Sequence, residues 1–593
     1  MENIPVRDFY YQQNLKFRTG LDQTRKRARL VAFARLITMV LAVWSLIRGI
    51  KIDSWIFFLL AGISLVLFFI LISYHKNLND FRKKMQILVD ITEHEMKSLD
   101  GDFSNFRNGK KYLDLDHEFT FDLDIFGEKS LFQFLNRCCT KAGERLLAEE
   151  IKHAPLHETM IKETRDRITE LSQKPDLLLD YRATGLLTDD SEEEQQEIIN
   201  WSENTTFNLP LISRIFIYIP VILNIIILLS SPFISGMINY LILTAIAGWF
   251  FYGLYIVKIN RYHISITRKQ DIINKYLDLS NVLAHSDLGK GKLAAFKNTS
   301  EMSLNLLKKL DRLMNFLDSR LNLLVGVILN TLFLLDFHVI LAMEKWKKTY
   351  SSNLADLFRT HAEFDRLVSK SYFVLNNPGF TWPEISEEPL IAMDLGHPLI
   401  QKDNRVCNDI HITPDEKVLI ITGANMAGKS TFLRTIGVNL ILAATGLKVC
   451  ASKMKFKPEK IITGMRTTDS LAESESYFFA ELKRLQRIVA GLENGESYFV
   501  LLDEILKGTN STDKHTGSEA LIKKLVHKKA TILVATHDLK LGELEKSFPG
   551  SVRNYHFESL IEHDELKFDY KLRKGIAVNM NATFLMRKMG ITG

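Results

Sequence analysis

The sequence contains few cysteines for its length. Its 593 residues include only 4, and no two of them have the Cys-x-x-Cys spacing that is typical of a zinc site or a redox motif. Neither a zinc site nor a disulfide framework is therefore suggested. We expect the adjacent Cys138 and Cys139 to be reduced residues on a helix. This cysteine usage is typical of a chain whose bulk lies in a reducing compartment such as the cytosol.

The chain also lacks a strong excess of one charge. Lys and Arg total 76 against 70 Asp and Glu, so the formal net charge is only +6 at pH 7. Spread over this length, the surplus is too small to indicate a nucleic-acid partner by itself, and a solvated surface with a few basic clusters explains it. No internal repeat or low-complexity tract is visible, and the length predicts several domains.

Long apolar runs, in contrast, are present. Hydrophobic residues make up 46% of the chain and charged residues 25%, an ordinary charged fraction, so the apolar excess must be local. A membrane-spanning helix needs about 20 apolar residues. Trp55–Ser73 meets this requirement without a charge, and the shorter Leu36–Ile47 precedes it across the link Arg48–Ser54. Together they predict a membrane hairpin whose flanking arginines reach towards water.

A second apolar stretch, Ile215–Val257, has no charged residue and is too long for one span. The segment Ser230–Gly236 contains Pro and Gly, which predicts a turn and hence two further spans. Basic residues lie on both sides of the first hairpin, whereas the tight links are almost uncharged. The positive-inside rule therefore predicts a multi-pass protein of the inner or plasma membrane, with the N-terminus, the core and the C-terminal domain in the cytoplasm.

A fifth apolar stretch, Leu321–Met343, is interrupted by polar residues, including Asp336 and His338. A span here would move everything that follows to the outside of the cell. We therefore expect this stretch to be a buried helix of a soluble core.

Composition and breakers divide the chain into six regions. We expect a basic tail and first hairpin at 1–80, a helix and linker at 81–118, a first part of a helical core at 119–210, the second hairpin at 211–260, the rest of the core at 261–380 and an α/β domain at 381–593. In the last region apolar strand-like runs alternate with helical ones. This alternation predicts a mostly parallel sheet with helices on both faces.

The α/β region carries a complete phosphate-binding motif. The sequence GANMAGKS fits GxxxxGK[ST], follows the strand-like run Val418–Ile421 and opens a helical pattern. Glycines let backbone N–H groups face phosphate, and the helix N-terminus adds partial positive charge. We expect Lys429 at the β- and γ-phosphates of ATP and Ser430 at Mg²⁺. The residues expected around the nucleotide are Gly423, Ala424, Asn425, Met426, Ala427, Gly428, Lys429, Ser430 and Thr431.

Two later strand ends supply further candidates. "YFVLLDE" ends in Asp503 and Glu504, and "ILVATHD" places His537 after another apolar run. A buried strand that ends in an acid delivers a carboxylate to the sheet edge. We expect Asp503 to bind Mg²⁺ and Glu504 to orient or deprotonate the attacking water. For His537 we favour a contact to the γ-phosphate or water over a purely structural role. For Ser476, a plain helix cap and an anion-binding hydroxyl both stay open.

These motifs together resemble the MutS family of DNA mismatch-repair ATPases. "TGANMAGKST" is similar to the family's TGPNMGGKST, "GHPLI" at Gly396–Ile400 lies upstream as in that family, and "LLDEILKGTNSTD" and "ATHD" resemble its later motifs. "DSLAESESYFFAEL" resembles DDLASGRSTFMVEM, which places Ser476 on the signature serine. Phe121–Ile151 resembles the opening of the family's helical core. The resemblance covers about 121–200 and 300–593.

The resemblance implies a homodimer that binds ATP with Mg²⁺ and hydrolyses ATP as a switch. In the family the two ATPase domains face each other, and the signature serine of one, here Ser476, completes the site of the other. The family's adenine-stacking aromatic is replaced in "RVCND" by Arg405 or Val406. Arg405 is the candidate, because a guanidinium can stack on a base.

No counterpart of the family's mismatch-reading domain is found, because residues 1–80 form the first hairpin in its place. Mismatch recognition is therefore not carried over, while DNA binding through the helical arms, a protein partner and membrane lipid stay open. The second hairpin falls about where the family's lever would extend, so we expect it to move with ATP. A transport-type ATPase and a non-catalytic membrane scaffold are the alternatives. The near absence of ionisable residues inside the spans argues against transport, and the intact catalytic set argues against a scaffold.

Overall fold

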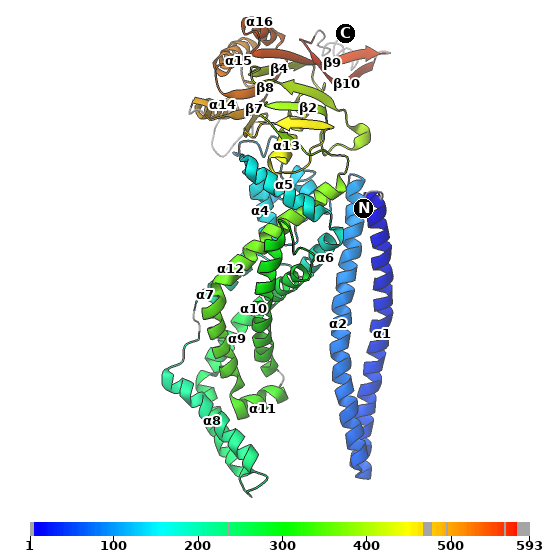
Figure 1. Cartoon of the computed structure of the whole chain (residues 1–593), viewed down its shortest axis with the longest axis vertical. Coiled ribbons are helices and arrows are strands. Elements are labelled where there is room, and N and C mark those ends of the chain that lie inside the picture. The colour runs from blue at the N-terminus through cyan, green and yellow to red at the C-terminus, as the bar shows by residue number, and fades with distance from the viewer. Residues whose placement is uncertain are drawn as a thin grey trace.

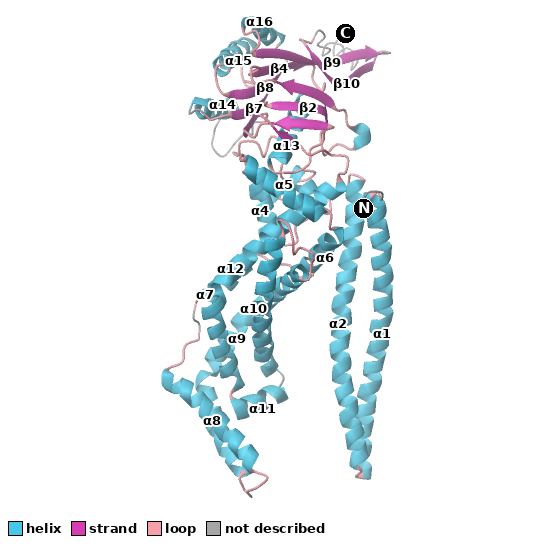
Figure 2. Cartoon of the chain, in the orientation of Figure 1, coloured by secondary structure: helices cyan, strands magenta, loops and turns pink. Residues whose placement is uncertain are grey.

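The computed structural model describes residues 5–204, 207–234, 236–321, 323–466, 477–493, 496–562 and 565–577. The molecule is elongated (Figure 1). An α/β part lies at one end, a helical body lies in the middle, and two groups of long helices extend to the opposite end. Figure 2 shows that the strands are confined to the α/β part.

The first hairpin consists of two very long helices packed side by side, α1 (Val6–Ile52) and α2 (Trp55–Leu99). They are joined by a tight turn at Asp53, whose φ is 51°. The predicted link is thus mostly helical. No proline and only one glycine occur within α2, so nothing breaks it at the expected boundary near residue 80. The apolar segment of each helix is therefore continuous with the polar part near Val6 and Leu99, which we call the base of the first hairpin.

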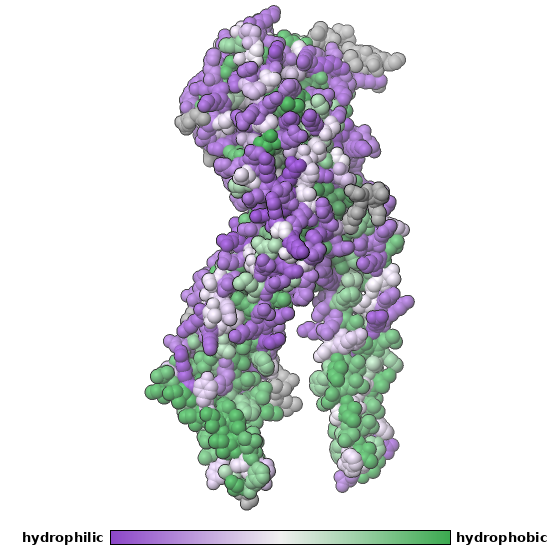
Figure 3. All heavy atoms as spheres, viewed as in Figure 1, coloured by the Kyte–Doolittle hydropathy of each residue, from purple (hydrophilic) through white to green (hydrophobic). Residues whose placement is uncertain are grey.

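The second hairpin is formed by α8 (Leu211–Ser230) and α9 (Ile238–Ala284), and α9 continues beyond its apolar part into the helical body. α1, α2, α8 and α9 are each long and apolar enough to cross a membrane, and at most 22% of the most apolar window of any of them is buried. Figure 3 shows that the apolar surfaces of both hairpins lie at the same end of the molecule, opposite the sheet.

The expectation of one buried helix at Leu321–Met343 is wrong. α11 (Leu323–Phe333) and α12 (Leu335–Asn376) meet at 81°, and the φ of Leu334 at the break is 47°. α11 packs against α8 and α9, and Ile328 is 53% exposed. The start of this stretch thus belongs with the second hairpin. A pair of helices bent in this way is compatible with either a broken span or a re-entrant segment.

Polar side chains stabilise this break. Asn224 of α8 donates to the Leu332 carbonyl (2.8 Å), which satisfies a backbone group that the interrupted helix leaves free. Asp336, 1% exposed, accepts from the Tyr252 hydroxyl (2.7 Å) and pairs with Arg320 (3.3 Å). Asp336, one of the polar residues that interrupt the apolar run, therefore binds α12 to the second hairpin through Tyr252.

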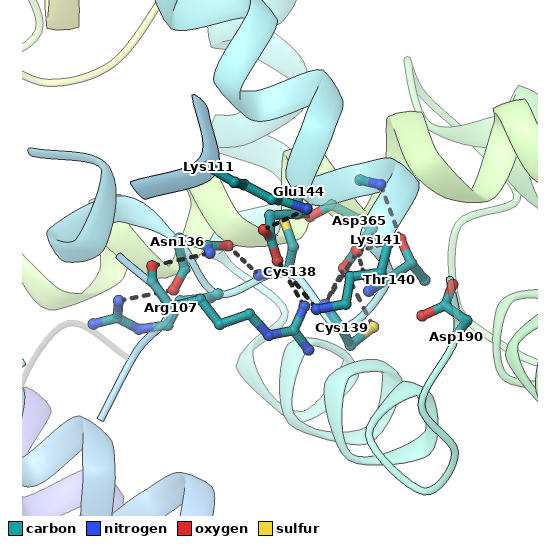
Figure 4. A network of polar contacts seen from close by, with 12 residues as sticks. Arg107, Lys111, Asn136, Cys138, Cys139, Thr140, Lys141, Glu144, Asp190 and Asp365 are labelled. Atoms are coloured by element: carbon teal, nitrogen blue, oxygen red, sulfur yellow. Dashed lines mark hydrogen bonds and ion pairs between the residues drawn. The ribbon is translucent and has the colours of Figure 1, made fainter. Parts of the chain in front are cut away.

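The helical body is arranged around α12. Its other helices are α3 (Leu131–Leu135), α4 (Lys141–Lys152), α5 (Glu158–Ser172), α6 (Pro175–Gly185), α7 (Glu192–Glu203) and α10 (Ala294–Asp318). Asp365 of α12 is fully buried and accepts hydrogen bonds from the Cys139 and Thr140 amides just before α4 (Figure 4). Cys138 and Cys139 are free, buried thiols in the segment between α3 and α4. They do not lie on a helix, so the expected helical position is wrong.

The main sheet of the α/β part has the order β10-β9-β4-β8-β7-β6, and all neighbours are parallel except β10 and β9. The strands are β4 (Val418–Gly423), β6 (Lys460–Gly464), β7 (Tyr498–Asp503), β8 (Ala530–Thr536), β9 (Val552–Glu562) and β10 (Glu565–Lys574). A smaller sheet, unpredicted from the sequence, has the order β1-β5-β2-β3. Its strands are β1 (Glu384–Ile385), β2 (Leu390–Leu395), β3 (Asn408–Ile412) and β5 (Lys453–Phe456).

Helices cover both faces of the main sheet, as the sequence predicts. Alternate residues of β4 lie in different cores. Leu419 and Ile421 pack in the core that contains α13 (Lys429–Ala444), whereas Val418 and Ile420 pack with α14 (Tyr477–Glu493) and α15 (Ser511–Leu525). The short α16 (Leu544–Ser547) lies beside β9. Burial on both faces explains why these strands are continuous apolar runs.

Candidate functional site

The predicted phosphate loop connects the end of β4 to the start of α13. Its backbone is left-handed at Gly423 (φ 149°), Met426 (φ 67°) and Gly428 (φ 106°). A Cβ at position 423 would meet the Phe557 carbonyl oxygen at 2.7 Å, so a side chain is excluded there. These positions allow the loop to curl over the N-terminus of α13, the geometry that turns amides towards an anion.

Lys429 is bent back onto the loop. Its side-chain amine donates to the carbonyls of Gly423 (2.8 Å) and Ala424 (2.9 Å) and lies 3.3 Å from Nε2 of His537. Burial lowers the pKa of Lys429 to about 8, although the carboxylates of Glu504 and Asp503 act in the opposite direction. A phosphate group would offer this amine a stronger, charged acceptor than the two carbonyls.

Glu504 and His537 form a pair at the ends of adjacent strands, β7 and β8. Their Oε1 and Nε2 atoms are 2.7 Å apart. The hydrogen bond from His537, helped by its charge, lowers the pKa of Glu504 to about 2 despite partial burial. Glu504 has a left-handed φ of 52°, so the chain turns sharply as it leaves the sheet. The parallel register thus brings together two residues that lie far apart in sequence.

The neighbouring Asp503 fits a cation. Its side chain is 9% exposed, and its Oδ1 atom has no hydrogen-bond partner among the described residues. A buried carboxylate oxygen without a partner is unfavourable unless a cation or water satisfies it. A carboxylate and the hydroxyl of Ser430, which follows Lys429 in the motif, are oxygen ligands of the kind that Mg²⁺ binds together with substrate phosphates. The residues present therefore fit the expected magnesium ion.

A cavity of about 420 Å³ opens beside the loop. Its lining includes Val406, Asn425, Lys429, Ser430, Glu504 and Tyr570. The cavity is thus lined by part of the predicted phosphate loop and by Glu504, the acid expected to orient water. Val406 and Tyr570, which lie outside the predicted motifs, complete this lining. A cavity of this size lies within the range of small-ligand sites.

Arg405, the predicted adenine contact, does not line this cavity. Its guanidinium donates to the Ile400 carbonyl (2.9 and 2.6 Å) and to Sγ of Cys450 (2.9 Å). Neighbouring residues of an extended segment point in opposite directions, and here Val406 faces the cavity while Arg405 faces away. The expectation for Arg405 is corrected on this ground: Val406, and not Arg405, lies beside this cavity.

Tyr570 was missed by the sequence analysis. It lies in β10 with a φ of 55°, and Asn408 donates to its carbonyl (3.0 Å). Its ring is so close to the loop that a Cβ on Gly428 would meet Cδ1 at 3.1 Å. Nothing in "KFDYKL" distinguishes Tyr570, because only the pairing of β10 with β9 and the irregularity in that pairing bring it over the loop.

His397 of the "GHPLI" motif also lines the cavity. Burial, together with the nearby charges of Arg434 and Arg405, lowers its pKa to about 4, so the imidazole is neutral at pH 7. Asn439 of α13 donates to the Gly396 carbonyl (3.0 Å) and fixes the motif against the helix that begins at Lys429.

Ser476 lies outside the described residues. The structure describes the chain up to Arg466, just beyond β6, and again from Tyr477, where α14 begins. The carboxylate of Glu481 accepts from the amides of Leu506 (2.5 Å) and Lys507 (3.1 Å). The first turns of α14 are thereby held to the segment that follows Glu504.

Comparison with known proteins agrees with this geometry. Residues 419–585 match the family model of MutS domain V. A DNA mismatch repair protein MutS of Thermotoga sp. (strain RQ2) is 33% identical over 234 residues, 39% of this chain and 29% of that protein. The corresponding protein of Aquifex pyrophilus is 34% identical over 221 residues, 36% of this chain and 25% of that protein. The matched segment, in the C-terminal part of this chain, thus covers less than a third of each of these two relatives.

Proposed function

We propose that this chain is a membrane-embedded, MutS-like ATPase that binds ATP with Mg²⁺, dimerises on binding and hydrolyses ATP as a switch. The observation that carries the proposal is the convergence of Lys429, Ser430, Asp503, Glu504 and His537 at one edge of a parallel sheet. That edge lies within the segment similar to MutS domain V.

The residues that line the cavity suggest where the phosphates and the adenine of ATP bind. Its phosphates lie on the loop, where the amine of Lys429 exchanges the carbonyls of Gly423 and Ala424 for phosphate oxygens. The lining also contains Val406 and the ring of Tyr570, and we place the adenine against these two side chains. The aromatic ring supplies the stacking surface that we first assigned to Arg405.

Hydrolysis depends on the second half of the site. Ser430 and Asp503 would hold Mg²⁺, which would supply positive charge to the phosphates. Glu504 orients the attacking water, because a carboxylate whose pKa is about 2 is a weak proton acceptor near neutral pH. His537 holds Glu504 in place. It also lies close to Lys429, where it can contact the γ-phosphate that Lys429 binds.

The dimer follows from the resemblance of Asp469–Leu482 to the family's signature segment. Two ATPase domains face each other, and Ser476 of one chain completes the nucleotide site of the other. ATP then joins the two protomers, and hydrolysis releases them.

The two hairpins make the chain a multi-pass membrane protein. Their exposed apolar side chains, at the same end of the molecule, are matched to lipid rather than water. The α/β part lies at the opposite end (Figure 1). We place it in the cytoplasm, where ATP is available. The membrane therefore occupies the place of the mismatch-reading domain, and any DNA binding is left to the helical arms.

The proposal is tested on the detergent-solubilised full chain. Lys429→Ala should lose nucleotide binding, and Glu504→Gln should bind ATP but hydrolyse it orders of magnitude more slowly and accumulate as a dimer. Lys523→Ala, an exposed lysine of α15 paired with Glu519, is the matched control and should behave as wild type. Wild-type turnover by the Glu504→Gln protein would refute the assignment. Adding duplex, branched or single-stranded DNA shows whether the nucleic acid stimulates the ATPase.

A further inference from the structure

The chain between β2 and β3 separates two cavities. We name residues 396–407 the strap. His397, Asn404 and Val406 line the nucleotide cavity on one side. On its other side, residues such as Gln401 and Arg405 line a larger cavity of about 900 Å³, which the last residues of α2 also line. Only Ile400 borders both cavities. The strap is thus a single layer of chain between the nucleotide and the base of the first hairpin.

The strap contacts the hairpin directly. Nε2 of Gln401 donates to the carbonyl of Asp100, the residue that caps α2 (2.8 Å). The Asp100 carboxylate in turn binds Arg7 of α1 (2.6 and 3.1 Å). The start of α1 and the end of α2 are therefore both bound to Asp100, the residue that Gln401 contacts.

The contact at Gly101 is tight. Its φ is 90°, and a Cβ at this position would meet Nε2 of Gln401 at 2.3 Å. The Gln401 amide therefore fills the space beside Gly101, and a side chain at position 101 would have to push it aside. Arg405 makes the strap stiff, because its guanidinium binds the Ile400 carbonyl and Cys450 on the side facing away from the nucleotide.

We propose that Gln401 is a positioning residue through which the base of the first hairpin sets the shape, and hence the affinity, of the nucleotide cavity. This inference rests on the proposed ATP binding. By linkage, the effect is reciprocal: a hairpin that shifts the strap changes nucleotide affinity, and a bound nucleotide shifts the hairpin by the same coupling free energy. The plain alternative is a hydrogen bond that only fastens two domains together.

A double-mutant cycle tests the proposal. Gly101→Ala places a Cβ where Nε2 of Gln401 lies, and so displaces the amide that binds the Asp100 carbonyl. The affinity for a non-hydrolysable ATP analogue, measured by calorimetry on the full chain in detergent, should fall by about 5- to 150-fold, the usual range of coupling between sites. Adding Gln401→Ala removes the clash and should restore the affinity to that of Gln401→Ala alone.

Gly127→Ala is the matched control. Its φ of 109° imposes the same kind of backbone strain, but no atom lies within 4 Å of the added Cβ, so nucleotide affinity should not change. Equal affinities for wild type, Gly101→Ala and Gly127→Ala would overturn the inference. So would a loss in Gly101→Ala that Gln401→Ala does not relieve, because that loss would come from strain or misfolding.

Hydrogen exchange supplies a second readout that does not depend on activity. The analogue should change the protection of the last turn of α2 in wild type and not in Gln401→Ala. Equal nucleotide-induced changes in both proteins would also overturn the inference. Failure of the proposed function is distinguishable, because wild type itself would then bind no nucleotide.

Discussion

Replacing Glu95 with Gln should loosen the base of the first hairpin. Glu95 of α2 is fully buried and is the shared partner of two guanidiniums, Arg137 (2.7 Å) and Arg182 (2.5 Å). Its other oxygen accepts from Asn376 at the end of α12 (2.8 Å). One carboxylate thus joins α2 to α6 and α12, and it is the counter-ion of two cations that are at most 7% exposed.

The magnitude follows from burial. Glutamine keeps the shape but leaves both guanidiniums without a counter-ion, and breaking a buried ion pair in this way costs about 3–5 kcal/mol. With about 1.4 kcal/mol for each factor of ten, the open form of this contact should become roughly two to three and a half orders of magnitude more populated. The amides near Glu95 should exchange faster by the same factor, where exchange requires this opening.

Hydrogen exchange followed by mass spectrometry measures this directly, and the same helix offers the control. Glu93 pairs with Arg18 at the surface, where the two side chains are 36% and 59% exposed. An exposed pair contributes only about 0–1 kcal/mol, so Glu93→Gln should change exchange at most several-fold. If Glu95→Gln exchanges no faster than Glu93→Gln, the hairpin is not held by this carboxylate.

Three further predictions concern the nucleotide site and the second hairpin. Binding of a non-hydrolysable ATP analogue should weaken as the pH rises through about 8, because Lys429, whose pKa burial lowers to about 8, is protonated below that pH and neutral above it; calorimetry showing constant affinity from pH 7 to 9 would contradict this. Mixing inactive Ser476→Arg and Lys429→Ala proteins should restore part of the ATPase activity, because one composite site in the mixed dimer is intact; heterodimers without activity would exclude a shared site. Asp336→Asn should cost about 3–5 kcal/mol by leaving Arg320 unpaired in the interior, whereas Asp356→Asn, which breaks a surface pair, should cost under about 1 kcal/mol; equal melting temperatures in detergent would refute the difference.

The sequence predicts those parts of the molecule that depend on local pattern. The phosphate loop, its strand and its helix lie within a few residues of one another, so spacing is sufficient to place Gly423 and Lys429. The four apolar helices are likewise local, because length and composition define them. Glu504 and His537 could be placed at one edge because parallel strands bring their carboxyl ends together.

What the sequence does not predict depends on contacts between distant segments. Tyr570 reaches the loop only through the pairing register of β10. Val406 rather than Arg405 faces the cavity, because successive side chains of the extended strap point in opposite directions. The break at Leu334 is stabilised by Asn224, more than a hundred residues earlier in the chain. Periodicity within Leu321–Met343 carries no sign of that partner, so a single helix was the natural expectation.

Among the described residues, the base of the first hairpin contacts the strap that borders the cavity, although sequence position favours the second hairpin. The second hairpin interrupts the helical core, and α9 continues into the helical body, where it packs on α10 and α12. α2, in contrast, ends at Leu99, next to the carbonyl that Gln401 of the strap binds. Its 45 residues form a rod of roughly 68 Å at 1.5 Å per residue. A tilt of about 5° at its base would therefore move its far end by roughly 6 Å. If the proposed coupling holds, a small tilt at the strap is therefore amplified along α2 into a displacement larger than a side chain.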